Sequence, residues 1–305
     1  MTDHTNPLSA EATTIAFIGL GVMGRPMAAN LRKAGYRVRG YNRTSSRADE
    51  LVALGGYRAS DVADAVDGAD VVITMLPDSP DVSEVLLADG GVLDLVTPGT
   101  VVVDMSTIEP SVSRLVAERA AERGCAALDA PVSGGEQGAI DAALSIMIGG
   151  DEATVARVAP IFQSIGKTLV HVGPSGSGQT VKAANQLIVA GNIELVAEAL
   201  VFLEAQEVDT TAALAVLSGG LAGSTVLARK GTSMIERRFE PGFRIALHDK
   251  DLGIYLGAAR SARTATPLGA VLGQLMATAN AEGDGGLDHS ALFRLVERMS
   301  GRADR

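Results

Sequence analysis

The chain has 305 residues, which is long for one domain and favours two. Its formal net charge of -10 argues against binding nucleic acid or an anionic membrane through bulk charge, so an anionic ligand must be held by local basic groups and backbone amides. Cys125 is the only cysteine, which excludes an intramolecular disulfide and a cysteine-based metal site.

The N-terminal segment, residues 1–11, is polar and lacks the basic-then-apolar pattern of a signal peptide, so we expect a disordered tail. No stretch is expected to be both long enough and free enough of charge to cross a bilayer. The longest apolar run contains Lys182, Glu194 and Glu198. These features predict a soluble, cytoplasmic protein.

Residues 14–18 form a short β-rich apolar run, and a helical pattern over residues 23–34 stops at Gly35. A G-x-G-x-x-G turn lies between them, a context typical of dinucleotide binding rather than of a structural glycine turn. Gly19 permits the tight turn, Gly21 lets the backbone approach a pyrophosphate, and Gly24 lets helix and strand pack closely. The residues predicted to contact the cofactor here are Gly19, Leu20, Gly21, Val22, Met23 and Gly24.

The second expected strand, residues 36–41, ends in Asn42, Arg43 and Thr44, where an NAD site would carry an acidic residue for the ribose hydroxyls. Asn42 removes that negative charge, and Arg43 offers a guanidinium suited to phosphate. Thr44 adds a hydroxyl and is expected to cap the next helix, whose dipole favours the phosphate. Arg43 can also stack on adenine in an NAD enzyme. The missing carboxylate therefore decides for NADP as the preferred cofactor, with NAD possible.

Two more buried strands are expected at residues 71–75 and 101–104. Strands that alternate with helices at this spacing predict an α/β Rossmann fold with a doubly wound, mostly parallel sheet, whose carboxyl edge holds the cofactor. The loops at that edge are ordinary turns or cofactor contacts, and Ser106 or Thr107 is expected to cap the helix after Pro110. The residues that we assign to the cofactor are Met75, Leu76, Pro77 and Thr107.

A further apolar segment, residues 128–130, leads to Ser133, Gly134 and Gly135. Consecutive amides of small residues with one hydroxyl suit a nest around a carboxylate, although a glycine pair in a turn needs no ligand. Strands over residues 144–148 and 170–173 complete the sheet. We expect the dinucleotide-binding domain to span residues 13–174 and the second domain residues 175–305.

The second domain should begin with one long helix over residues 177–207, which would span ~45 Å and link two bodies. Lys182, Asn185 and Gln186 stand at i, i+3 and i+4, so all three project from one face. In one interpretation both residues are structural: Lys182 extends its amine to solvent from a helix end, and Asn185 caps the helix or bridges neighbouring groups. In the other, an ammonium held in a cleft by an amide passes a proton.

Beyond residue 207 no strand pattern recurs, which predicts an all-α domain. Lys250 and Asp251 on one of its helices could form a plain surface ion pair. The four histidines show no metal-ligand spacing, and each is expected to be structural. The expected helices span residues 211–217, 226–235, 247–262, 268–282 and 290–299.

Three segments together resemble the β-hydroxyacid dehydrogenase family over residues 14–299: 19–31, 129–135 and 178–185. The resemblance implies a Rossmann domain, an all-α domain joined by the long helix, and Lys182 as proton donor and acceptor beside Asn185. Ser133, Gly134 and Gly135 fall on the family's carboxylate-binding motif. Thr107 and Lys250 fall on positions that contact the nicotinamide end of the cofactor.

Residues 219–227, 241–252 and 288–292 resemble the branch of the family that reduces tartronate semialdehyde to glycerate with NAD(P)H, apart from Asn42, where many such reductases keep an acidic residue. Sibling activities remain open: 3-hydroxyisobutyrate dehydrogenase, or a reductase of glyoxylate or succinic semialdehyde. A non-catalytic cofactor-binding module or an imine-reducing relative would be expected to lack Lys182. The apolar face of the long helix predicts a homodimer or homotetramer.

Overall fold

The computed structural model describes residues 7–302. The chain forms two compact units, the first ending at Lys182 and the second beginning at Ala183. This division falls inside the long helix α9 (Ser177–Ala205), which starts in the first unit and continues into the second.

The first unit contains a sheet of nine strands within the described residues, in the order β3-β2-β1-β4-β5-β6-β8-β7, with β9 paired to β8. Pairing is parallel from β3 through β6, whereas β8 runs antiparallel to β6 and β7 and parallel to β9. The expected doubly wound, mostly parallel sheet is confirmed. Its strands are β1 (Thr14–Ile18), β2 (Arg37–Tyr41), β3 (Tyr57–Arg58), β4 (Val71–Thr74), β5 (Val101–Asp104), β6 (Ala126–Asp129), β7 (Val132–Ser133), β8 (Leu144–Gly149) and β9 (Gly166–Gly173).

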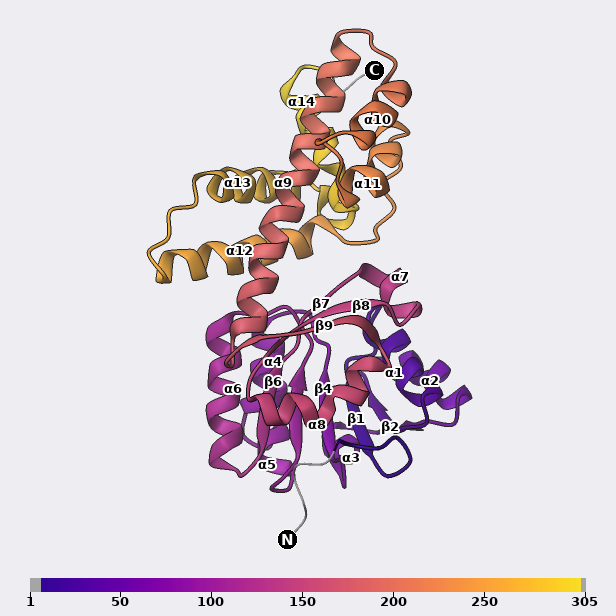
Figure 1. Cartoon of the computed structure of the whole chain (residues 1–305), viewed down its shortest axis with the longest axis vertical. Helices are drawn as coiled ribbons and strands as arrows, with labels where there is room; N and C mark the ends of the chain where they lie inside the picture. The colour runs from indigo at the N-terminus through magenta and orange to yellow at the C-terminus, as the bar shows by residue number, and fades with distance from the viewer. Residues whose placement is uncertain (1–6, 303–305) are drawn as a thin grey trace. The chain divides into compact units, whose positions relative to one another are not determined.

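Both faces of this sheet are covered by helices (Figure 1). Successive side chains of a strand point to opposite faces, so Ile15 and Phe17 enter one core while Ala16 and Ile18 enter the other. Strands buried on both faces read as continuous apolar runs, which is why they were visible in the sequence. The helices are α1 (Gly24–Lys33), η1 (Ser45–Ala48), α2 (Asp49–Ala53), α3 (Val62–Val66), α4 (Ser79–Leu87), α5 (Val92–Leu95), α6 (Pro110–Glu122), α7 (Gly135–Ile140) and α8 (Glu152–Gln163).

The second unit is helical, apart from an isolated bridge between Arg244 and Asp288. Its core is built around α9, which contributes Ala190, Ile193 and Leu200. Together with the Rossmann sheet, this unit gives the two-part fold that the sequence predicts. Its other helices are α10 (Thr210–Gly219), α11 (Thr225–Ile235), α12 (Ile245–Ser261), α13 (Pro267–Ala281), η2 (Asp284–Gly286), η3 (His289–Ala291) and α14 (Leu292–Met299).

By length and composition alone, α9 is apolar enough to cross a membrane, so the expectation that no stretch would qualify is wrong. The core helix of a soluble protein passes the same test, and one such helix is weak evidence for a span. Ala190, Ile193, Ala197 and Leu200 are fully buried in the second unit. The apolar character of α9 is therefore explained in part by its place in a protein core.

Two local expectations are also wrong. The N-terminal segment is not a tail from Leu8 onward, because the Leu8 N–H donates to Arg157 O at 2.9 Å and its side chain packs on the core. Residues 1–6 lie outside the described part of the chain. Neither Ser106 nor Thr107 caps α6, whose N-cap is Glu109 without a side-chain cap. The Ser106 hydroxyl instead donates to Asp104, a nearer and buried acceptor.

Candidate active site

The glycine turn after β1 combines two tightly packed glycines with an open one. Gly19 has a φ of +102°, and a Cβ there would clash with Met75 O. A Cβ on Gly24 would clash with Gly19 O, whereas a Cβ on Gly21 would meet nothing within 4 Å. The turn thus leaves open space at Gly21, next to the first turn of α1, where backbone amides favour an anion. These residues fit the pyrophosphate of a dinucleotide.

Asn42 joins this turn to the loop after β2. Its Oδ1 accepts from the Leu20 N–H at 3.0 Å, and its Nδ2 donates to Thr44 O at 3.1 Å. The acceptor bond therefore links the two loops, and the donor bond stabilises the loop after β2 itself.

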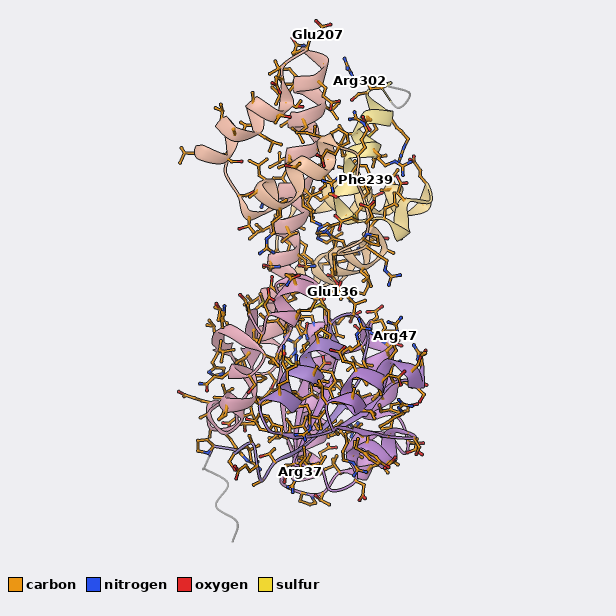
Figure 2. The ribbon with its side chains drawn as sticks, turned by 90° about the vertical axis from the view of Figure 1, so that its right-hand side faces the viewer. Arg37, Arg47, Glu136, Glu207, Phe239 and Arg302 are labelled. Atoms are coloured by element: carbon orange, nitrogen blue, oxygen red, sulfur yellow. The ribbon has the colours of Figure 1, made fainter. Side chains whose placement is uncertain are left out.

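Basic side chains follow Asn42 at the surface. The Arg43 side chain is 82% exposed, and its guanidinium lies 3.8 Å from Asp81 Oδ1. Arg47, a few residues on, is also exposed (Figure 2) and was not singled out from the sequence. Thr44 precedes the 3₁₀ helix η1 without a side-chain cap, so the predicted Thr44 cap is wrong. Its backbone carbonyl accepts from Arg47 N instead.

Asp104, at the end of β5, ties two cofactor-edge loops together. Its Oδ1 accepts from the Thr74 hydroxyl at 2.7 Å and from the Ser106 hydroxyl at 2.6 Å. Ser106 Oγ in turn accepts from the Leu76 N–H at 2.8 Å. Burial raises the pKa of Asp104 to about 6, although the hydrogen bonds from Ser106 and Thr74 oppose the shift. Sequence reasoning gave Asp104 no role; an acidic residue that closes an all-valine strand is the signal that points to it.

Ser133, Gly134 and Gly135 connect β7 to α7. Both glycines have positive φ angles, +141° and +69°, and a Cβ on Gly135 would meet nothing within 4 Å. The turn therefore needs glycine and leaves its backbone accessible. Glu136 follows in the first turn of α7 (Figure 2), so a carboxylate would be held here by amides and the Ser133 hydroxyl rather than by local positive charge.

Lys182 and Asn185 lie one helical turn apart on α9. Lys182 is buried, and Asn185 is half-buried. Asn185 Nδ2 donates to Gln186 Oε1 at 2.9 Å, and Gln186 Nε2 donates to Asp251 Oδ2 at 2.5 Å. A chain of amides thus connects Asn185 to a buried carboxylate of α12.

Asp251 also pairs with Lys250, whose Nζ lies 3.0 Å from Asp251 Oδ1. The Lys250 side chain is 18% exposed and that of Asp251 is 2% exposed. The two residues do form an ion pair, but it is largely buried and is not the plain surface pair considered from the sequence. A buried carboxylate fixes the lysine more firmly than a solvated one would. The ion pair with Asp251 therefore holds the Lys250 side chain in place within the second unit.

The second unit also holds a buried histidine pair with no sequence-predicted catalytic role. His248 Nδ1 lies 3.0 Å from His289 Nδ1, and His248 Nε2 lies 3.0 Å from Gln186 O. Burial lowers the pKa of His289, so this ring stays neutral near pH 7. His4 lies outside the described residues, and within residues 7–302 no group of three or more His, Cys, Asp or Glu is placed to hold a metal ion.

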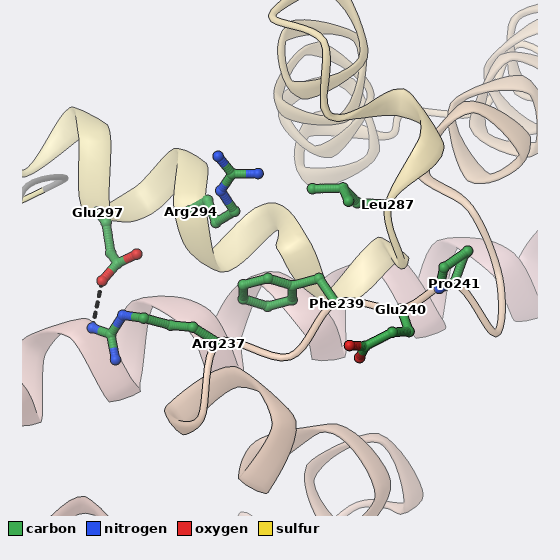
Figure 3. A pocket seen from close by; sticks show the side chains of 7 residues that line it. All are labelled: Arg237, Phe239, Glu240, Pro241, Leu287, Arg294 and Glu297. Carbon is green, nitrogen blue, oxygen red and sulfur yellow. Dashed lines mark hydrogen bonds and ion pairs between the residues drawn. The ribbon is translucent and has the colours of Figure 1, made fainter.

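A cavity of about 540 Å³ in the second unit contains none of the predicted site residues. Arg237 on its wall pairs with Glu297 (Figure 3) and with Glu204, and Arg294 pairs with Asp284. Both arginines on its wall are therefore already paired with carboxylates of the chain. Its lining residues are Arg237, Phe239, Glu240, Pro241, Leu287, Arg294 and Glu297.

Comparison with known families assigns both parts of the chain. Residues 14–173 match the NAD binding domain of 6-phosphogluconate dehydrogenase, and residues 176–296 match the family described as NAD-binding of NADP-dependent 3-hydroxyisobutyrate dehydrogenase. The chain belongs to the β-hydroxyacid dehydrogenase family. It is an NAD(P)-dependent oxidoreductase that acts on CH–OH groups.

Individual relatives in this family cover nearly the whole chain. It is 44% identical to 2-hydroxy-3-oxopropionate reductase of Escherichia coli (strain K12), over 94% of this chain and 98% of that protein. It is 39% identical to the probable 3-hydroxyisobutyrate dehydrogenase-like 1, mitochondrial, of Arabidopsis thaliana, over 96% and 88%. The solved structure of Mycobacterium tuberculosis 3-hydroxyisobutyrate dehydrogenase with L-serine superposes with a TM-score of 0.85 at 36% identity, covering 93% of this chain and 99% of that one.

Proposed function

We propose that this β-hydroxyacid dehydrogenase reduces a small 3-oxo acid, tartronate semialdehyde, to glycerate. Tartronate semialdehyde is 2-hydroxy-3-oxopropionate, the substrate named for the Escherichia coli relative at 44% identity. The observation that carries the proposed chemistry is Lys182, a buried amine on α9 one helical turn from the Asn185 amide. We propose that residues 13–174 form the dinucleotide-binding domain, and that residues 175–305 form an all-α domain that contributes to substrate binding and to oligomer contacts.

The bound reduced nicotinamide supplies the hydride, and the protein residues bind, orient and protonate. The amides of Ser133, Gly134 and Gly135 hold the substrate carboxylate, which fixes the distance from that carboxylate to the reacting carbonyl. Lys182 Nζ then donates a proton to the alkoxide as it forms. Asn185, tethered through Gln186, orients the substrate oxygen or the amine.

The cofactor that we propose is NADPH, with NADH used less well. Asn42 places no negative charge beside the adenosine ribose, and two exposed guanidinium groups, Arg43 and Arg47, suit a 2′-phosphate. The glycine-turn residues Gly19 to Gly24, the loop residues Met75, Leu76, Pro77 and Thr107, and Lys250 complete the proposed cofactor contacts. We propose that the enzyme works in the cytoplasm as a homodimer or homotetramer.

A second candidate is oxidation of 3-hydroxyisobutyrate, favoured by the names of the Arabidopsis and Mycobacterium relatives. In both substrates a single carbon separates the carboxylate from the reacting carbon. The same residues could therefore bind the carboxylate and exchange a proton with the substrate oxygen in either case. The two differ at the carbon between, which bears a hydroxyl in tartronate semialdehyde and a methyl in the aldehyde of 3-hydroxyisobutyrate.

A substrate panel separates these functions. Initial rates with NADPH and with NADH would be measured for tartronate semialdehyde, glyoxylate, succinic semialdehyde and 2-methyl-3-oxopropionate. We expect the highest kcat/KM for tartronate semialdehyde with NADPH. A higher kcat/KM for 2-methyl-3-oxopropionate would assign the enzyme to the second candidate function.

A further inference from the structure

The Gln179 side chain connects α9 to the loop after β5 through two hydrogen bonds. An amide is neither an acid nor a base near neutral pH, so no catalytic role follows from its chemistry. It lies in the first turns of α9 and is 1% exposed. Its Nε2 donates to Ser106 O at 2.8 Å, and its Oε1 accepts from the Ile108 N–H at 3.1 Å. One side chain therefore bonds to the backbone on both sides of Thr107.

The backbone of Gln179 is held as firmly as its side chain. Asp129, at the end of β6, accepts from the Gln179 N–H at 2.9 Å with Oδ2 and from the Gly176 N–H at 2.7 Å with Oδ1. A Cβ on Gly178 would clash with Met147 O and lie 2.7 Å from Asp129 O. The start of α9 thus lies directly against the ends of β6 and β8, and only glycine allows that approach.

The loop that Gln179 binds, residues 106–108, is itself hydrogen-bonded to the sheet. Ser106 is bonded to Asp104 through its hydroxyl, and the same hydroxyl accepts from the Leu76 N–H. Gln179 therefore joins α9 to a hydrogen-bonded unit that includes the loops after β4 and β5. Networks of this kind act as one rigid body, because each buried polar group would be left unpaired if the others moved.

Lys182 follows Gln179 by three residues, so the two side chains project from the same face of α9 in adjacent turns. We propose that Gln179 is a positioning residue, which holds the Lys182 amine in fixed register with the Ser106–Ile108 backbone. The proposal rests on the proposed role of Lys182 as proton donor. Proton transfer requires hydrogen-bond reach, and a misplacement of about 1 Å can cost ~100-fold in rate.

The first test compares turnover with cofactor binding in Gln179→Ala. We expect kcat to fall ~10- to 100-fold, while the Kd for NADPH, measured by calorimetry without substrate, changes less than about threefold. Gln179→Met, which keeps the side-chain volume and removes both hydrogen bonds, should behave alike and controls for a cavity. Unchanged kcat in both variants, or a loss carried by the NADPH Kd alone, would overturn the proposal.

Thr180→Ala is the matched control. Its hydroxyl donates only to Gly176 O in the same helical turn, and its side chain is exposed. Removal of that hydroxyl perturbs the start of α9 without cutting its link to the Ser106–Ile108 loop. We expect kcat within about twofold of wild type. If Thr180→Ala lowers kcat as much as Gln179→Ala does, any disturbance at the start of α9 is enough to lower kcat. That result would contradict a specific role for Gln179.

A double-mutant cycle with Lys182→Ala distinguishes positioning from general stability. A residue that acts by placing the Lys182 amine should matter little once that amine is gone, so Gln179→Ala should cost less than about twofold in the Lys182→Ala background. The same fold loss in both backgrounds would overturn the positioning role and leave the proposed function standing. A Lys182→Ala enzyme with near wild-type kcat would instead reject the proposed role of Lys182 as proton donor, on which this inference rests.

Discussion

Asn42 and Leu20 link the loop after the second strand to the glycine turn, through a 3.0 Å hydrogen bond from the Leu20 N–H to Asn42 Oδ1. An aspartate at this position could accept the same bond. It could not replace the bond from Asn42 Nδ2 to Thr44 O, and it would add a negative charge beside the proposed ribose site. The amide therefore supports the turn without the charge that selects NADH.

Asn42→Asp should shift the cofactor preference toward NADH. The carboxylate would repel a 2′-phosphate and accept hydrogen bonds from the ribose hydroxyls. One charge-assisted hydrogen bond corresponds to about ten- to hundred-fold in affinity, so the ratio of kcat/KM for NADPH to that for NADH should fall by this order. Asn42→Ala, which removes the amide without adding charge, is the control and should weaken both cofactors together. An unchanged ratio in Asn42→Asp would contradict the proposed NADPH site.

Lys182→Ala should lower turnover by ~10²–10⁴, because no other group is assigned to protonate the alkoxide. NADPH binding should survive, since the glycine turn and Asn42 remain intact. Lys167→Ala, at an exposed lysine on β9, provides the control for loss of a positive charge. If Lys182→Ala keeps more than about a tenth of wild-type turnover, the general-acid role is wrong.

Aldehydes without a carboxylate should be poor substrates. The amides of the Ser133–Gly135 turn would be left without their acceptor, and sites built around a polar partner strongly reject analogues that lack it. We expect kcat/KM for propanal to lie ~100-fold or more below that for tartronate semialdehyde. Ser133→Ala should raise the KM for the acid and leave the KM for propanal unchanged. Equal efficiency on the two aldehydes would exclude a carboxylate site.

Much of the parallel sheet could be predicted from the sequence because each buried strand is a short apolar run bounded by a turn. The two-residue strands β3 and β7 could not, because two residues carry no period. The change of pattern at residue 207, from alternating elements to helices alone, likewise revealed the second unit.

The support of the candidate site was less predictable. Ser106 follows a strand and precedes a helix, so a cap was the local expectation, yet its hydroxyl bonds to buried Asp104. Gln179 bonds to residues about 70 positions earlier in the chain. Such partners are set by how the strands are ordered in the sheet, and no local pattern encodes them. Local sequence patterns therefore suggest candidate ligand contacts more readily than they suggest the buried residues that support them.

Glu194 should make the second unit less stable as pH rises. Burial raises its pKa to about 7, with a further contribution from Glu198, and neither carboxyl oxygen has a hydrogen-bond partner among the described residues. The folded state then binds a proton that the unfolded state releases above its ordinary pKa of 4.5. The unfolding free energy should therefore fall as pH rises between these values.

Glu194→Gln removes this titration and should stabilise the protein at pH 8 relative to wild type, by about 3 kcal/mol at most. Below the ordinary glutamate pKa both proteins carry a neutral side chain, so the two should converge near pH 4. Denaturant unfolding at pH 5 and pH 8 measures the difference. Parallel stability profiles for wild type and Glu194→Gln would show that Glu194 does not titrate as described.

The last prediction concerns self-association through α9. Ile188, Leu195 and Phe202 recur every seven residues and are 62%, 67% and 62% exposed. This spacing places them along one side of the helix, while Ala190, Ile193 and Ala197 are buried in the core of the second unit. An extended apolar stripe left in water is typical of an interface. We therefore expect a dimer or tetramer in which α9 contacts a second copy of the chain.

Leu195→Glu places a charge in the middle of this stripe and should shift the protein to a smaller assembly at micromolar concentration, because a buried unpaired carboxylate is costly. Leu221→Glu makes the same substitution at a fully exposed leucine between α10 and α11 and should leave the assembly unchanged. Size-exclusion chromatography with light scattering gives the mass of each variant. A monomeric wild-type protein would exclude the interface, and an oligomer that persists in Leu195→Glu but dissociates in Leu221→Glu would place it elsewhere.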